Sequence, residues 1–121
     1  MKKANALAAL AALSQENRLE AFRALVQAGP EGLSAGNLAE FVGIAPNTLT
    51  FHLDRLREAD LVTVRRDGRS MIYAARFVTI NALLAFLTEN CCGGAPEKCL
   101  PLTSKPTPTK PTKSRRKDSV S

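Results

Sequence analysis

Three residues, Gly43 to Ala45, connect two short segments in which apolar residues recur at helical spacing. The first segment begins after Ser34, whose hydroxyl suits a helix N-cap, and Gly43 suits its end. Pro46 suits the first turn of the second segment, because proline has no N–H to leave unsatisfied there. A connection this short makes two helices cross steeply, so the sequence predicts a helix-turn-helix.

The second helix of this pair should run to about Ala59, with Leu49, Leu53 and Leu56 on its buried face. Residues 61–75 then change to an alternation of apolar and polar side chains. Asp67-Gly68 in the middle of this stretch is a strong signal for a hairpin turn. A hairpin that directly follows such a helix pair gives the element order of a winged helix-turn-helix.

Three further helices are expected. Residues 3–13 and a helix with Ser14 as its N-cap precede the pair, and a last helix spans roughly residues 78–90. The last helix is apolar over a wide arc, more than a monomer of this size needs to bury, which favours a partner helix in a homodimer. The expected fold class is therefore mainly α with a small β-hairpin.

The second helix of a helix-turn-helix enters the major groove of DNA with its N-terminal residues near the base edges. No acidic residue lies between Pro46 and Leu53, so nothing there repels the duplex. The Asn47 amide can bond adenine, and arginines around the hairpin turn can reach phosphates or an adjacent minor groove. The candidate DNA contacts are Asn47, Thr48, Thr50, Phe51, His52, Arg55, Arg65, Arg66 and Arg69.

Each of these residues also has a simpler explanation. Helix-turn-helix pairs occur in proteins that never touch DNA, polar residues at a helix start are often only caps, and a charged hairpin is usually just solvated. A lone histidine on a helix is more often solvated or at a core edge than a ligand. The second helix of the pair is hereafter called the reading helix. An expected position on its exposed side favours a DNA contact for His52.

The placement of charge matters more than its sum. Of the net charge of +6, the tail from Lys105 carries +5, with six basic residues and one acidic residue, and residues 1–104 carry +1. The tail is rich in Thr, Pro, Ser, Lys and Arg without apolar periodicity. We expect a winged-helix DNA-binding and sensor domain over residues 1–102 and a disordered basic tail over residues 103–121. No run of 18 apolar residues exists, so we expect no membrane partner and a cytoplasmic location.

Three cysteines, Cys91, Cys92 and Cys99, lie within nine residues. Clustered thiols in a reducing cytosol suggest metal binding or redox chemistry. Thiolates are soft ligands, and three of them in a pyramid suit trivalent arsenic or antimony. Gly93 and Gly94 release the chain from helical geometry, and the stretch between Cys92 and Cys99 reaches roughly 20 Å, so all three thiols can meet in one subunit.

Other uses of the thiols stay open. They can be buried spectators, or they can form a disulfide switch in which Cys99 pairs with Cys91 or Cys92. Zinc normally takes four ligands, often with His or carboxylate, and only Glu97 is near. Cadmium, lead and copper(I) are further alternatives.

The stretch from Leu38 to Val64, followed by Arg66 to Tyr73, resembles the ArsR/SmtB family of metal-responsive repressors. The resemblance covers roughly residues 5–92. It implies a homodimer built from the first and last helices, which binds an inverted-repeat operator in double-stranded DNA and is released by an inducer. The residues that carry it are His52-Leu53, Leu56-Arg57-Glu58-Ala59, Leu61-Val62 and an Arg-Asp-Gly-Arg wing that ends in Tyr73.

The chain departs from two patterns of this family. Some arsenic sensors carry Cys-Val-Cys on the helix before the turn, and zinc sensors carry Asp and His ligands on the last helix. Here residues 38–42 hold no cysteine, and residues 78–90 hold neither Asp nor His. The chain instead resembles the arsenite repressors with three cysteines at the C-terminal end. That resemblance implies a repressor of an arsenic-resistance operon, with arsenic(III) or antimony(III) as inducer and no organic cofactor.

Two rival functions differ in class. A repressor of the same fold can sense oxidation through a disulfide among the same cysteines. A thiol-dependent arsenate reductase fits less well, because the sequence shows no phosphate-cradling loop and no activated cysteine near a helix N-terminus. We therefore expect a protein that is not an enzyme.

Overall fold

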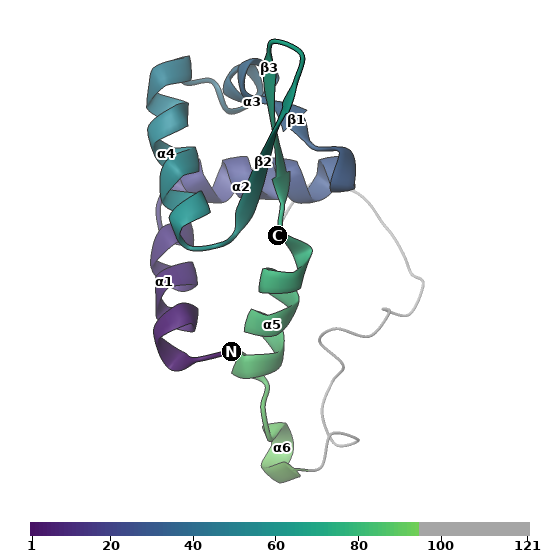
Figure 1. The fold of residues 1–121 in the computed structure, drawn as a ribbon. Helices are drawn as coiled ribbons and strands as arrows, with labels where there is room; N and C mark the ends of the chain where they lie inside the picture. Colours follow the sequence, from purple (N-terminus) through teal and green to yellow (C-terminus); the bar gives the residue numbers. More distant parts are fainter. Residues whose placement is uncertain (95–121) are drawn as a thin grey trace, which may run out of the picture. The chain divides into compact units, whose positions relative to one another are not determined.

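The computed structural model describes residues 1–94 of the 121-residue chain, which divides after Leu87 into two compact units. The predicted domain boundary at residue 102 lies outside the described residues. The prediction of a mainly helical chain with a small sheet is confirmed, and the order of the elements is that of a winged helix-turn-helix (Figure 1). The elements are α1 (Lys3–Leu13), α2 (Glu16–Ala28), the 3₁₀ turn η1 (Gly29–Glu31), β1 (Leu33–Ser34), α3 (Ala35–Val42), α4 (Pro46–Glu58), β2 (Val62–Asp67), β3 (Ser70–Ala75), α5 (Phe77–Leu87) and α6 (Cys91–Gly94).

The hairpin predicted around Asp67-Gly68 is present as strands β2 and β3. They pair antiparallel over their whole length, from Val62 opposite Ala75 to Asp67 opposite Ser70. Gly68 opens the two-residue turn with a φ of +63°, a conformation that glycine adopts without strain.

A third strand joins the hairpin and ties it to the helices. β1 pairs antiparallel with β3, with Leu33 opposite Tyr73, so the strand order is β1-β3-β2. Gly32, just before β1, has a φ of +74°, and a Cβ there would collide with the Tyr73 carbonyl oxygen. Glycine is therefore required for β1 to approach β3 this closely.

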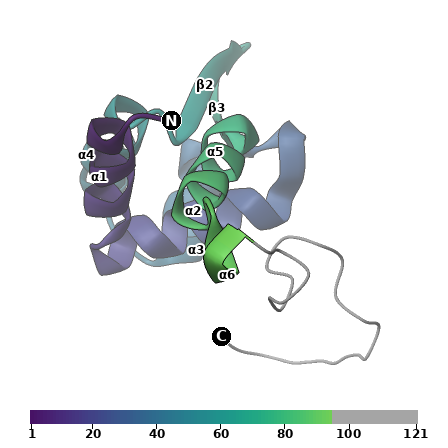
Figure 2. The ribbon, with the colours of Figure 1, turned by 90° about the horizontal axis from the view of Figure 1, so that it is seen from below.

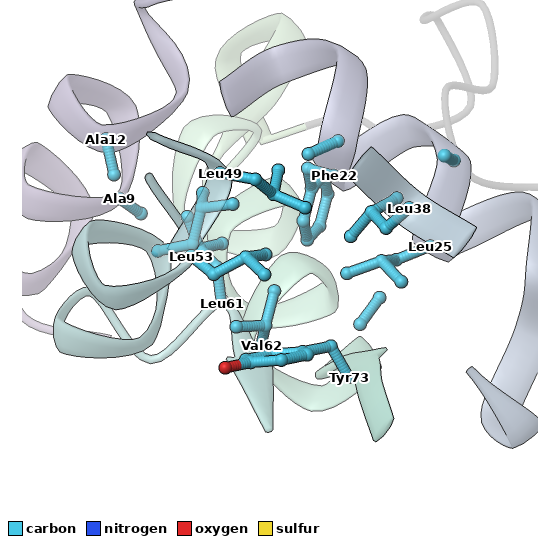
Figure 3. Packing of buried hydrophobic residues seen from close by; sticks show 14 of the residues in the cluster. Ala9, Ala12, Phe22, Leu25, Leu38, Leu49, Leu53, Leu61, Val62 and Tyr73 are labelled. Carbon is cyan, nitrogen blue, oxygen red and sulfur yellow. The ribbon is translucent and has the colours of Figure 1, made fainter. Parts of the chain in front are cut away.

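The core of the first unit lies where α2, α3 and α4 meet the base of the hairpin (Figure 3). Burying one leucine side chain is worth about 1.5–3 kcal/mol, so this cluster fixes the position of α4 against α2 and α3. The fully buried large side chains are Leu25, Leu38, Leu49, Leu53, Leu56 and Leu61.

Two helix boundaries differ from the predictions. α2 begins after Gln15, whose side chain accepts the Arg18 N–H at 2.9 Å, and Ser14 instead donates its hydroxyl to the Ala11 carbonyl at the end of α1. The last long helix ends at Leu87, earlier than expected, and Asn90 takes a left-handed φ of +57° before the short α6. Among the described residues, no helix is long and apolar enough to cross a membrane.

Candidate DNA-binding interface and thiol segment

The connection between α3 and α4 is fixed by local capping, as predicted. The Ser34 hydroxyl accepts the Asn37 N–H at 3.1 Å at the start of α3. Gly43 ends α3 with a left-handed φ of +83°, and its N–H donates to the Ala39 carbonyl at 2.8 Å. Pro46 occupies the first turn of α4. In Figure 1 the start of α4 lies at the same end of the first unit as the hairpin turn, so both can face one ligand.

The first turns of α4 expose polar groups opposite its buried leucines. Asn47, Thr48 and Thr50 are exposed. The Asn47 side-chain oxygen accepts the Thr48 N–H at 3.0 Å, and the Thr50 hydroxyl donates to the Pro46 carbonyl at 3.0 Å. The Asn47 amide N–H groups and the remaining lone pairs of Thr50 can therefore still bond base edges or phosphates.

Phe51 and Arg55 extend this exposed face by one turn. The Phe51 ring is 55% exposed, and the Arg55 guanidinium carbon lies 5.1 Å from its centroid. Arg55 also pairs with Glu58 at 3.2 Å. This ion pair is exposed to solvent and therefore weak, so the contact of Arg55 with a phosphate stays a prediction.

His52 lies on the buried side of α4, so its expected exposed position is wrong. The residue is only 8% exposed, and its Nδ1 lies 3.4 Å from the Arg18 guanidinium. Because a guanidinium only donates, a hydrogen bond here needs an unprotonated Nδ1, which the neutral form of the ring provides. Burial, and then the charge of Arg18, lower the pKa of His52 below its usual value. The reason for expecting His52 to contact DNA is thereby removed.

Arg18 is a structural residue that sequence reasoning missed. Its Nε donates to the Ala12 carbonyl at 2.7 Å, while its Nη1 reaches His52 on α4. This side chain therefore joins the end of α1 to the reading helix. Its partner on α4 is 34 positions away in sequence, so no local pattern marks it.

The three arginines of the wing, the hairpin of β2 and β3, differ in whether other parts of the protein already bind their guanidinium groups. Arg65 donates to the Glu31 carbonyl at 3.1 Å, which ties β2 to η1, and Arg66 donates to the Gly68 carbonyl at 3.3 Å. Arg69 is exposed in the turn itself. Within residues 1–94 no hydrogen bond or ion pair engages the Arg69 guanidinium, so it is the wing charge best placed to meet a phosphate.

A second unpredicted cluster follows the end of α4. Asp60, in a left-handed conformation with φ +65°, pairs with Arg76 at 3.3 Å. The buried Thr79 on α5 donates its hydroxyl to the same carboxylate at 3.5 Å. This cluster links α5 to the segment that leaves the reading helix.

Only part of the predicted thiol site lies within the described residues. Cys91 is half-buried at the start of α6, and its N–H donates to the Thr88 carbonyl at 3.0 Å. The Cys92 side chain and all of Cys99 lie outside what the structure describes. Among the side chains that the structure describes, no three from His, Cys, Asp or Glu gather closely enough to hold a metal ion.

Comparison with known proteins agrees with this arrangement. A helix-turn-helix domain model matches residues 13–65. The chain is 32% identical over 87 residues to the HTH-type transcriptional regulator YgaV of Escherichia coli (strain K12). The aligned stretch covers 72% of this chain and 86% of that protein. It is 38% identical over 78 residues to the uncharacterized HTH-type transcriptional regulator YceK of Bacillus subtilis (strain 168), covering 64% and 77%.

A solved structure extends the likeness to the three-dimensional fold. An ArsR-like transcriptional regulator from Rhodococcus sp. RHA1 matches with a TM-score of 0.65 at 26% identity, over 78% of this chain and 86% of that chain. These relatives are regulators of transcription rather than enzymes. The chain accordingly belongs to the ArsR-like family of winged helix-turn-helix transcriptional regulators, and it is a DNA-binding regulator, not an enzyme.

Proposed function

We propose that this regulator represses an arsenic-resistance operon as a cytoplasmic homodimer. Trivalent arsenic, or antimony, binds Cys91, Cys92 and Cys99 and releases the dimer from an inverted-repeat operator. Allosteric coupling of about 1–3 kcal/mol corresponds to about a 5- to 150-fold change in affinity, which is enough to empty an operator.

The position of the paired thiols carries this proposal. Cys91 and Cys92 are adjacent, so their Cα atoms are about 3.8 Å apart and both sulfurs can reach one soft ion. They open α6, a single helical turn that begins after a left-handed Asn90. Gly93 and Gly94, the last two residues of α6, have φ of +67° and +85°, so the backbone departs from right-handed helical angles directly after the pair. Such a break leaves the following residues able to bring Cys99 back.

The exposed apolar surface of α1 and α5 supports the homodimer. α1 turns Ala6, Ala9 and Ala12 inward and leaves Leu7 59% exposed. On α5, Val78 is 69% exposed. Both helices lie at the end of the first unit away from the hairpin turn (Figures 1 and 2). A second copy packed there would cover these side chains and leave two reading helices free for two half-sites, as an inverted repeat requires.

The proposal is tested by release from DNA. The probe is a duplex recovered from a random library by the full chain, hereafter the selected duplex. Fluorescence anisotropy is followed while arsenite, antimonite, cadmium or peroxide is added, in a phosphine reductant that has no thiol to compete for arsenic. We expect arsenite and antimonite to release the selected duplex. Release by peroxide alone, once the reductant is left out, would favour the redox alternative.

Three single variants, Cys91→Ser, Cys92→Ser and Cys99→Ser, test the three-sulfur site. Each should bind the selected duplex like the unmodified chain, because none of the thiols belongs to the reading helix. Each should also lose arsenite release. If only one of the three variants lost it, a three-coordinate site would be wrong.

A further inference from the structure

Phe51 is a large apolar side chain in the middle of a polar DNA-reading face. It follows Asn47 by four residues, so both side chains project from the same side of α4. The side opposite to them holds Leu49, Leu53 and Leu56, which are fully buried. Phe51 therefore contributes little to the core, and at 55% exposure most of its side chain is accessible to a ligand on this face.

The Phe51 ring is held in place by its neighbours. The Arg55 guanidinium lies 5.1 Å from the ring centroid and is itself held by Glu58 at 3.2 Å. The His52 ring meets Phe51 edge-on, with centroids 5.7 Å apart at 64°, and His52 is buried against Arg18. Contacts with Arg55 and His52 restrict the ring, so it loses less conformational freedom when it binds a ligand, which favours specific contact.

The major groove offers such a ring one distinct apolar group. The base edges there present hydrogen-bond donors and acceptors, and the exception is the C5-methyl of thymine. We propose that Phe51 recognises a thymine in the operator by contact with this methyl group. Asn47 and Phe51 are about 6 Å apart along the helix axis, and base pairs stack about 3.4 Å apart. The thymine should therefore lie within about two base pairs of the base that Asn47 contacts.

Deoxyuridine tests this directly, because it pairs like thymidine and lacks only the methyl group. Each thymidine of the selected duplex is replaced in turn, and affinity for the full chain is measured without arsenic. We expect one position in the half-site to lose about fourfold in affinity, the size of one methyl group leaving water. The Phe51→Ala variant should bind the thymidine and deoxyuridine duplexes equally at that position.

Phe41→Ala is the matched control, because Phe41 is a 66% exposed phenylalanine on α3 rather than on the reading helix. It should keep the full discrimination. The proposal is overturned if no deoxyuridine position weakens binding, or if Phe51→Ala still discriminates. It is also overturned if Phe51→Ala weakens binding to every duplex by the same factor, because the discrimination between thymidine and deoxyuridine would then persist. This inference rests on DNA binding by α4 and does not require the arsenic site. The thymine contact and the proposed response to arsenic can therefore fail separately.

Discussion

The imidazole of His52 is buried and accepts from Arg18, so folding holds it in its neutral form. Its pKa is lowered in the folded chain, whereas in the unfolded chain it returns to about 6.5. Well above pH 6.5 neither state is protonated, and the contribution of His52 to stability is fully present. As the pH falls through 6.5 toward the lower folded pKa, the unfolded chain binds the proton first and the free energy of unfolding falls. We therefore expect the free energy of unfolding to be lower at pH 5.5 than at pH 7.5, as measured by urea unfolding at one protein concentration.

The variant His52→Gln is the control, because glutamine keeps an acceptor and does not titrate. Its free energy of unfolding should change less over the same pH range. The chain has a single histidine, so NMR can follow this titration without overlap. An unchanged pH slope in the variant would show that other groups cause the loss.

Position 52 also shows what a local pattern can and cannot predict. Its spacing of three residues from Leu49 places it on the buried face of α4, and helical periodicity alone contains that information. The partner that makes burial of a polar ring tolerable is Arg18, which no pattern around position 52 reveals. The link between Asp60 and Thr79 escaped prediction for the same reason, since each partner is ordinary in its own segment.

Among the elements, those with strong local signals were predicted correctly. The cap at Ser34, the left-handed Gly43, Pro46 and the Asp67-Gly68 turn each act within a few residues, so the helix-turn-helix and hairpin follow from sequence. The start of α2 was misplaced because serine suits either side of a helix boundary. Ser14 closes α1 and does not open α2.

Substitutions in the reading helix and in the wing should change DNA binding in different ways. Arg69→Ala removes an exposed phosphate contact, so affinity should fall for all duplexes and the slope of log affinity against log salt should shrink by about one unit. Asn47→Ala should instead relax the preference for particular bases, with the salt slope kept. Both are measured on the selected duplex and on single-base variants at several salt concentrations. A uniform loss for Asn47→Ala would contradict base recognition by its amide.

At the scale of the whole molecule, the apolar surface on α1 and α5 should control the oligomeric state. Val78→Lys places a charge where a second copy would pack, and the exposed position means that the fold itself should tolerate it. We expect sedimentation to show dimer for the unmodified chain and monomer for the variant at the same concentration. Circular dichroism should stay unchanged, and affinity for the selected duplex should fall. Met71→Lys, an exposed apolar position on the hairpin, should leave the dimer intact.

The basic tail from Lys105 should raise the affinity for DNA without changing the release of DNA by arsenite. Its charge of +5 attracts any duplex, because each neutralised phosphate releases counterions. A chain ending at Ser104 keeps Cys91, Cys92 and Cys99, so its release by arsenite and its base preference should persist. Its affinity for random DNA should be lower at low salt, and the difference should shrink as salt rises. If ending the chain at Ser104 abolished release by arsenite, the tail would have to be part of the inducer response, and three thiols alone would not explain it.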